Sequence, residues 1–543
     1  MRERTAVLAV AVIALFAALA ATVALGDDPL PQAITHQHWN GFDALQKSND
    51  GQTGIAQYKN APSPICSTAT SSAANVSTDC EGIAPHNETS IAIDPLNASH
   101  MIGSANDYQL ANGGSNETIF SRVHETWDGG NTWTTYPIDY NSYIATGDPA
   151  VAFDATGRMY VATLGFGFGQ GSPNAKSADV LVATSTDGTT WSDPTKVANG
   201  TGSEFGVGIF NDKEYVTAWG DGNAIVTWSR FVDLQHGAYG GSPIYASVTH
   251  DGGQTWSAGV EISGSAPFCA GFSGDTTCNQ DQNSTPVVAA DGSIYVSFLS
   301  ERDATNGRNA YAVVKVDPAT GQRVAGPFKV ADLVDGVTDY PIDVFGDTVY
   351  QDSMFRTWSA GNSTADPTNA RHLAVTWSDM RNSPLTSSDP YVTATNSDVG
   401  VAESLDGGQT WKTTIFALSG DQFMPWGAFD PSGRLRVGFF DRSYDRANHK
   451  YGYTLATETK PGSLAFTRQQ VSTSLSDPTA NDRWFSTVTE NAAFPHPSSF
   501  LGDYSGIAAG KNGVASYWTD MRSTVTFGGR SGFGEDAEFA LTK

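Results

Sequence analysis

Acidic residues recur at one position of a repeated sequence pattern, directly before a run of small and apolar residues. The acids are Glu88, Asp148, Glu204, Asp339 and Asp503 in five copies, and Thr285 and Met424 stand in the other two. Carboxyl groups that a fold gathers in one place can act as general acids and bases or bind a cation. The recurrence therefore predicts a ring of carboxyl groups. We expect any catalytic or ligand-binding site to lie beside this ring.

Arginines recur at a second position, where the next extended run ends. The phrases WSDMR, WTDMR, FFDRS, FLSER and TWSRF place there Arg381, Arg522, Arg442, Arg302 and Arg230. A guanidinium group can hold a carboxylate through two parallel hydrogen bonds. In one interpretation these arginines pair with neighbouring acids and only tie the repeated units together. In the other, some of them bind an anionic ligand such as an acidic sugar, and the acids supply acid–base groups.

Both positions belong to a unit that occurs seven times along the chain. Clear copies are DPAVAFDATGRMYVATLGF at 148–166, STPVVAADGSIYVSFLSE at 284–301 and MPWGAFDPSGRLRVGFF at 424–440. Each unit holds four short extended runs, A to D, separated by turns rich in Asp and Gly. Four antiparallel strands repeated in this way predict an all-β fold, a β-propeller with about seven blades; six blades is the alternative.

The seventh unit contains only three extended runs before Lys543. We expect a strand from the segment 27–85 to complete this blade, so that the ring has no open edge at its seam. The candidate strands are AITHQHW at 33–39 and GIAQYKN at 54–60. In this topology the recurring acids lie around the axis on one face, and the C–D turns lie on the other.

The C–D turns repeat almost the same words: TWDGGNTW at 126–133, THDGGQTW at 249–256 and SLDGGQTW at 404–411, with the shorter STDGTTW at 185–191. The Asp of such a turn can accept hydrogen bonds from backbone N–H groups, and Gly permits positive φ. We therefore assign a structural role to Asp128, Asp187, Asp251 and Asp406.

These turns resemble the Asp box, or bacterial neuraminidase repeat, of sialidase-like β-propellers, and the resemblance extends over residues 86–543. It implies a glycan-acting propeller, an exo-α-sialidase-like glycoside hydrolase with a Tyr and carboxylate as nucleophile, an Asp as acid/base and arginines on the sugar carboxylate. On this sequence it implies catalytic roles for Asp148, Asp339, Tyr340, Asp503 and Tyr504, and substrate-binding roles for Glu88, Glu204 and the five arginines.

A non-catalytic extracellular propeller that binds glycan, protein or Ca²⁺ is the alternative function. No Arg lies between Arg4 and Arg122, whereas sialidases carry one near the start of the propeller. Whether the chain is an enzyme stays open at this level. Carboxylate oxygens at the axis are suitable ligands for Ca²⁺, the one cofactor that the sequence suggests.

The remaining sequence features concern the compartment. Arg2 and Arg4 precede an apolar run, so residues 1–26 are expected to be a signal peptide or an uncleaved membrane anchor. Of the three pairings that four cysteines allow, Cys66–Cys80 and Cys269–Cys278 are the simplest. A net charge of −26 excludes a nucleic-acid partner. We therefore expect an extracellular monomer with a glycan or glycoprotein ligand.

Overall fold

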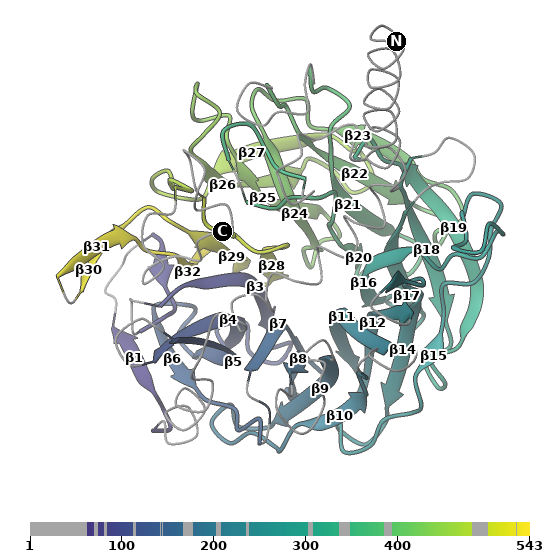
Figure 1. The fold of residues 1–543 in the computed structure, drawn as a ribbon, viewed down its shortest axis with the longest axis horizontal. Helices are drawn as coiled ribbons and strands as arrows, with labels where there is room; N and C mark the ends of the chain where they lie inside the picture. The colour runs from purple at the N-terminus through teal and green to yellow at the C-terminus, as the bar shows by residue number, and fades with distance from the viewer. Residues whose placement is uncertain are drawn as a thin grey trace, which may run out of the picture.

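The computed structural model describes residues 62–543, except 70–73, 81–83, 112–115, 142, 144, 167–177, 202–207, 235–237, 302–307, 336–347, 354, 385–393, 480–497 and 528. Its strands form seven antiparallel blades around a central axis, with the first strand of each blade nearest that axis (Figure 1). The described residues contain no helix. The predicted all-β propeller with seven four-stranded blades is therefore confirmed.

The first four blades are as follows, from the axis outward. Blade 1 is β3 (His86–Ile93), β4 (Met101–Ala111), β5 (Asn116–Thr126) and β6 (Thr132–Tyr136). Blade 2 is β7 (Ala145–Phe153), β8 (Met159–Phe166), β9 (Ala178–Ser185) and β10 (Thr195–Ala198). Blade 3 is β11 (Gly208–Trp219), β12 (Asn223–Leu234), β14 (Ile244–Thr249) and β15 (Val260–Glu261). Blade 4 is β16 (Asp281–Val288), β17 (Ile294–Ser300), β18 (Ala310–Val316) and β19 (Arg323–Asp332).

The last three blades follow the same order. Blade 5 is β20 (Ser363–Ala365), β21 (Leu373–Asp379), β22 (Asp398–Ser404) and β23 (Lys412–Ile415). Blade 6 is β24 (Gln422–Phe429), β25 (Leu435–Asp441), β26 (Gly452–Glu458) and β27 (Phe466–Gln470). Blade 7 is β28 (Gly506–Gly510), β29 (Gly513–Asp520), β32 (Asp536–Thr542) and β2 (Val76–Ser77).

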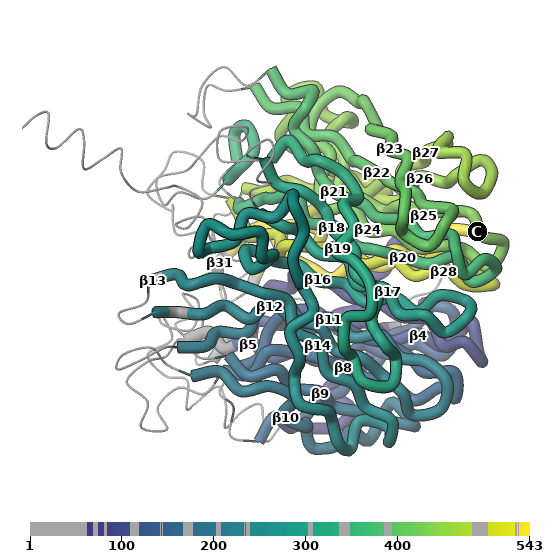
Figure 2. Tube along the Cα trace, turned by 90° about the vertical axis from the view of Figure 1, so that its right-hand side faces the viewer, coloured from purple at the N-terminus to yellow at the C-terminus, as the bar shows by residue number. Residues whose placement is uncertain are grey.

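Four further short strands lie outside this pattern. They are β1 (Cys66–Ala69), which pairs with β6, β13 (Ala238–Tyr239), which pairs with β12, and the hairpin of β30 (Thr524–Phe527) with β31 (Arg530–Phe533). Both β13 and the β30–β31 hairpin are inserted between the second and third strands of their blades. In the side view they lie on the same face of the propeller (Figure 2). We call this the B–C face, and the opposite one the A–B face.

The second strands of the blades are largely buried because neighbouring blades cover both of their faces. Every residue of β8 is buried, and so is every residue of β17. The outermost strand β27 has the reverse composition, FTRQQ, and four of its five residues are exposed. The core consequently lies between blades, where Tyr160, Trp228 and Phe231, for example, belong to one buried cluster.

The seam between blades 7 and 1 is closed by the N-terminal segment. Strand β2 pairs with β32 through Val76 and Ser77, as the fold prediction requires. The two candidate strands at 33–39 and 54–60 lie outside the described residues. Just beyond β2, Cys80 forms a disulfide with Cys66, and the Cys269–Cys278 disulfide is also present, so both predicted pairings are confirmed.

The repeated C–D turns have the same contacts in each blade that carries them. In the first, Asp128 Oδ1 accepts hydrogen bonds from the N–H groups of Asn131 and Thr132, each at 2.9 Å. Asp406 Oδ1 accepts the equivalent bonds at 3.0 and 2.9 Å. The indole of Trp133 is fully buried and packs at 5.0 Å against Phe539 of blade 7. These turns fasten hairpins and fill the space between blades.

Two blades start at other residues than the repeat predicts. The inner strand of blade 5 is β20, whereas the sequence pattern places it at 339–350. The true A–B turn of this blade is ADPTNARH, where Asp366 accepts hydrogen bonds from Thr368 and His372. In blade 3 the stretch NDK reads as a turn between two strands, but it lies within β11.

Among the described residues, no helix is long and apolar enough to cross a membrane.

Candidate functional site

A β-bulge interrupts five of the inner strands near their start, where pairing with the second strand shifts in register. The residue at each bulge has a left-handed backbone, with φ between 47° and 58°: Glu88, Asp148, Lys213, Asn283 and Met424. Bulges redirect a side chain out of the regular alternation of a strand. The repeated bulge thus fixes the direction of three ionisable side chains, from blades 1, 2 and 3.

The ammonium group of Lys213 is surrounded by carboxylates from different blades. Its Nζ lies 2.6 Å from Asp503 Oδ2 and 2.8 Å from Asp148 Oδ2. Glu88 Oε1 and Asp212 Oδ1 are 3.7 and 3.9 Å away. We define the axial cluster as Glu88, Asp148, Asp212, Lys213, Glu214, Arg356, Asp503 and Tyr504.

Arg356 supplies the second cation of the axial cluster. Its Nε donates to Asp503 Oδ1 at 3.1 Å, and its terminal NH2 group donates to Asp503 Oδ2. Burial opposes ionisation of Asp503, but Arg356 and Lys213 together lower the pKa of this carboxyl. Asp503 is therefore a fixed carboxylate held from two sides.

Glu88 is in a different electrostatic state from Asp503. Burial, and then the neighbouring Asp148 carboxylate, raise the pKa of Glu88 well above its usual value. The amide of Asn106 donates to Glu88 Oε2 at 2.7 Å and accepts from the Asp148 N–H at 2.8 Å, so it holds the two residues side by side. A pair of carboxyl groups held side by side, one of them with a raised pKa, is a common arrangement for acid–base catalysis.

Asp148 is the most exposed of the carboxylates that contact Lys213. Its side chain is 14% exposed, compared with 2% for Glu88 and 1% for Asp503. Of these carboxylates, Asp148 is therefore the one most accessible to solvent.

Tyr504 places a phenol next to the same acids. Its hydroxyl donates to the carbonyl of Pro149 at 3.4 Å, and its ring packs against Trp426. Burial, and then Glu88 and Asp148, raise the pKa of Tyr504 well above its usual value. The phenol therefore keeps its proton and acts as a hydrogen-bond donor.

Four of the residues singled out from the sequence come together in the axial cluster: Glu88, Asp148, Asp503 and Tyr504. Glu204, Asp339 and Tyr340 lie outside the described residues. The position equivalent to Glu88 in blade 3 is held by Lys213, so the register expected there is wrong. In blade 5 the inner strand begins at Ser363, far beyond Asp339.

Sequence reasoning missed Asp212, Lys213, Glu214 and Arg356. The phrase FNDKEY resembles a polar turn in an apolar run, and only the structure shows that it contains a bulge equivalent to those at Glu88 and Asp148. Arg356 lies in the long connection between β19 and β20, where no repeat marks it.

Two of the recurring arginines pair with the aspartate two residues before them. Arg381 holds Asp379 through two bonds of 2.6 and 2.7 Å, and Arg522 holds Asp520 through bonds of 2.7 and 2.5 Å. The phrases WSDMR and WTDMR encode this geometry, because the preceding Trp also donates to each aspartate. These two arginines therefore hold carboxylates of their own blades.

The other three recurring arginines differ. Arg442 is completely buried and lies 3.3 Å from Asp421. Arg230 lies 4.8 Å from the ring of Tyr245 and has no ion pair with a described residue. Arg302 is outside the described part of the chain. The described arginines at this position therefore do not form a set that converges on one anion.

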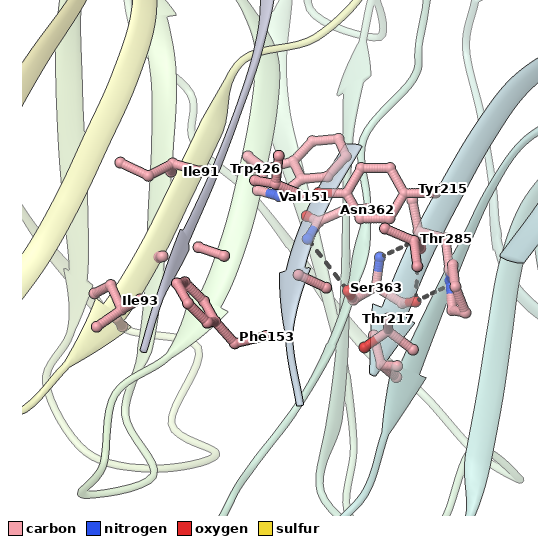
Figure 3. A pocket seen from close by; sticks show the side chains of 17 residues that line it. Ile91, Ile93, Val151, Phe153, Tyr215, Thr217, Thr285, Asn362, Ser363 and Trp426 are labelled. Carbon is pink, nitrogen blue, oxygen red and sulfur yellow. Dashed lines mark hydrogen bonds between the residues drawn. The ribbon is translucent and has the colours of Figure 1, made fainter. Parts of the chain in front are cut away.

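A cavity of about 290 Å³ opens along the axis on the other side of Tyr215 and Trp426. Its walls come from the inner strands of all seven blades, with Ile91, Ile93 and Phe153 facing Thr285 and Ser363 (Figure 3). No charged side chain is among its lining residues. The hydroxyl of Ser363 is already bonded to the Thr285 carbonyl at 2.9 Å. This cavity therefore offers no carboxyl group for acid–base chemistry.

The carboxylates that the sequence suggests as Ca²⁺ ligands instead surround the Lys213 ammonium. Within the described ranges, no group of three or more His, Cys, Asp or Glu side chains could hold a metal ion. A positive charge is thus supplied at the axis by the chain itself.

No protein-family model and no curated protein matches this sequence. Among solved structures, a Dyadobacter fermentans protein of unknown function is 10% identical, with 87% of this chain and 99% of that one covered and a TM-score of 0.41. A Penicillium chrysogenum α-L-arabinanase is 13% identical over 87% and 98%, with a TM-score of 0.41. The NanB sialidase of Streptococcus pneumoniae is 7% identical over 89% and 100%, with a TM-score of 0.39. Similarity this low carries no information about the activity of this chain.

Proposed function

We propose that this protein hydrolyses glycosidic bonds of uncharged glycans at the axial cluster. The observation that supports this most strongly is that the Asn106 amide holds Glu88, whose pKa is raised by burial and Asp148, beside the more exposed Asp148. Two carboxyl groups are the usual machinery of glycoside hydrolysis. The resemblance of the C–D turns to the Asp boxes of sialidase-like propellers adds support for a glycan substrate.

In the proposed reaction, Glu88 and Asp148 share one proton. Asp148 delivers this proton to the glycosidic oxygen as the bond from that oxygen to the anomeric carbon breaks. A water molecule adds its oxygen to the anomeric carbon, and the proton that it releases returns to the Glu88–Asp148 pair. Lys213 balances the charge of the pair.

The charges favour an uncharged sugar over an acidic one. The axial cluster contains five carboxyl groups and only two cations, Lys213 and Arg356, and both cations contact its own carboxylates. Arg381, Arg442 and Arg522 are paired with aspartates as well. An exo-α-sialidase-like activity needs cations that are available to the sugar carboxylate, so we place it behind hydrolysis of neutral glycans.

A non-catalytic propeller that binds glycan or protein is the second candidate. The burial of the cluster favours it, because the side chains of Glu88, Asp503 and Lys213 are only 2%, 1% and 5% exposed. Buried ion-pair networks can have a purely structural role.

We also propose that the protein is exported, with residues 1–26 as a signal peptide or membrane anchor. Two disulfides support this, because disulfides persist in oxidising compartments.

The experiment incubates the purified protein with a panel of uncharged and acidic oligosaccharides and identifies products by mass spectrometry. We expect new reducing ends from uncharged substrates, and a loss of at least about 100-fold in the rate for Asp148→Asn. Equal activity of wild type and Asp148→Asn would overturn the proposal. Binding of a glycan without turnover would favour the second candidate.

A further inference from the structure

Trp127 is a large aromatic side chain that the fold leaves on the surface. It lies in the C–D turn of blade 1, between β5 and β6, and is 55% exposed. No other described Trp, Tyr or Phe is as exposed; the next are Phe272 with 43% and Tyr444 with 39%. Tryptophans on a protein surface are enriched where a ligand or partner binds.

The indole of Trp127 is held in place by His100. The two rings are stacked, with centroids 3.6 Å apart and planes 8° from parallel. The His100 ring is itself fixed, because Nδ1 bonds Asp94 Oδ2 at 2.8 Å and Nε2 bonds Glu125 Oε1 at 2.9 Å, all in buried positions. One face of the indole is therefore covered, and the exposed part is a preformed flat surface, which binds with little loss of conformational freedom.

The fold does not require a tryptophan at this position. The equivalent residues in the other three C–D turns are Thr186, His250 and Leu405. Blade 5 repeats even the histidine and its two acids, since His372 lies 2.9 Å from Asp366 Oδ2 and 3.4 Å from Glu403 Oε1. Its turn carries Leu405, and His372 is still 1% exposed. The indole is therefore not needed to cover the histidine.

The turns around Trp127 offer uncharged polar groups. The Gly129 N–H donates to the Ser99 carbonyl at 2.9 Å, so the A–B turn of blade 1 lies against the C–D turn. The Asn512 amide, from the A–B turn of blade 7, donates to the Ser99 hydroxyl at 3.2 Å. The carboxylate of Asp128 already accepts hydrogen bonds from its own turn. Hydroxyl and amide groups both donate and accept, as the hydroxyls of a neutral sugar require.

This surface is separate from the axial cluster. Trp127 lies on the A–B face, whereas Glu88 and Asp148 lie near the start of the inner strands β3 and β7, at their other end. A ligand on Trp127 is thus not the sugar unit at the axial cluster. The net charge of −26 disfavours an acidic polymer.

We propose that Trp127 is the centre of a second, non-catalytic glycan site that binds an uncharged polysaccharide. The C–H groups on one side of a sugar ring lie against the electron-rich face of the indole. The Ser99 hydroxyl and the Asn512 amide form hydrogen bonds with hydroxyls of the same chain of sugars. The choice of a glycan rests on the proposed function, and the site holds the protein on a polymer.

The test is electrophoresis in native gels that contain dextran, arabinan, xyloglucan or galactomannan, with polygalacturonate as the acidic comparison. Each protein carries Asp148→Asn, so that the polymer is not degraded. We expect at least one uncharged polymer to retard the protein. Trp127→Leu, which copies the turn of blade 5, should weaken binding at least about tenfold, and Trp127→Phe should stay within about threefold. The matched control Leu405→Ala should migrate like its parent.

Three results in these gels would overturn the inference: equal retardation of Trp127→Leu and its parent, no retardation by any uncharged polymer, or retardation by polygalacturonate alone. Size-exclusion chromatography tests a different occupant, a second copy of the chain. We expect wild type and Trp127→Leu to elute alike at all concentrations. A wild-type dimer that Trp127→Leu abolishes would also overturn the inference.

Failure of the inference differs from failure of the proposed function. On a short soluble glycoside, Trp127→Leu should keep the kcat/KM of the wild type, because Trp127 lies on the opposite face. If Asp148→Asn loses activity but Trp127→Leu binds polymer like its parent, only the second site is wrong. If retardation depends on Trp127 while Asp148→Asn stays active, the axial hydrolysis is wrong and the second site stands.

Discussion

At the scale of single residues, Lys213 determines whether the axial carboxylates can be packed together at all. It comes from blade 3 and contacts acids from blades 1 and 2 and from the segment ahead of blade 7. Burial works against the charge of Lys213, but Asp148, Asp212 and Asp503 raise its pKa well above the usual value. The ammonium of Lys213 therefore stays charged at neutral pH.

Lys213→Met should strongly destabilise the protein, because it leaves buried carboxylates without their cation. We expect a loss of about 3–5 kcal/mol in the free energy of unfolding, measured by urea denaturation. The matched control is Lys196→Met. Lys196 Nζ also lies 2.6 Å from a carboxylate, Asp179, but its side chain is 46% exposed. The control substitution should lower the free energy of unfolding by about 1 kcal/mol or less. Equal losses in both variants would contradict this account.

The repeat in the sequence reveals some of these residues and hides others. Glu88, Asp148 and Asp503 stand out because acids recur at the same place in the unit. Lys213 is hidden because NDK has the composition of a turn, and only tertiary contacts tell a bulge from a turn. Arg356 belongs to a connection without a repeat, so nothing in its neighbourhood predicts that it will meet Asp503.

At the scale of elements, the C–D turns join a hairpin to the neighbouring blade. Gly130 shows this most clearly, because a Cβ added there would lie 2.0 Å from the Phe539 ring of blade 7. The adjacent Gly129 also has positive φ, but no atom lies within 4 Å of its added Cβ. Substitution of each glycine in turn therefore distinguishes the effect of backbone strain from the effect of the contact between blades.

We expect Gly129→Ala to lower the free energy of unfolding by about 1–2 kcal/mol through its left-handed backbone alone. Gly130→Ala should lose a further 1–3 kcal/mol, roughly, because Phe539 must move. Chemical denaturation of both variants provides the comparison. Equal losses would show that the turn is not packed against blade 7.

Strands can be predicted from the sequence where the alternation of apolar and polar residues agrees with the position of the turn residues, as in 148–166 and 424–440. Blade 5 fails this test because its inner strand β20 has only three residues, Ser363–Ala365, and no apolar run. The apolar stretch at 339–350 attracts the assignment instead. The three residues of β20 pair with β21 because blades 4 and 6 flank the place that they occupy. No local sequence pattern contains this information.

At the scale of the whole molecule, many buried carboxyl groups determine how stability depends on pH. Burial, above all, raises the pKa of Asp281 and Asp536 to about 7 and that of Glu301 to about 8. In the unfolded chain the same groups have pKa values near 4, roughly. Below that pH both states are protonated, and the stabilisation is complete.

The protein should consequently lose stability as the pH rises from about 4 to about 8, because the unfolded chain ionises first. The opposite sign applies to Asp430, whose pKa is lowered to about 2 by hydrogen bonds from Ser432 and Arg436 despite its burial. Its contribution is lost as the pH falls below about 4. Melting temperatures measured from pH 3 to pH 9 should have their maximum near pH 4–5, and a maximum above pH 7 would contradict this.

The overall architecture follows from the sequence because seven similar units leave few other ways to bury their strands. The strand that closes the seam between blades 7 and 1 cannot be predicted from the sequence in the same way. The closing strand β2 has two residues, Val76 and Ser77, and is too short to produce a pattern. Its place is determined by the unpaired edge of β32 and by the Cys66–Cys80 disulfide next to it.

The central claim is that Asp148 in the axial cluster carries out acid–base chemistry on a glycan. It is tested most directly by kcat/KM for one uncharged glycoside, measured in the wild type, Asp148→Asn and Asp281→Asn. We predict a fall of at least about 100-fold for Asp148→Asn and a value close to wild type for Asp281→Asn. An Asp148→Asn enzyme as active as the wild type would contradict the claim.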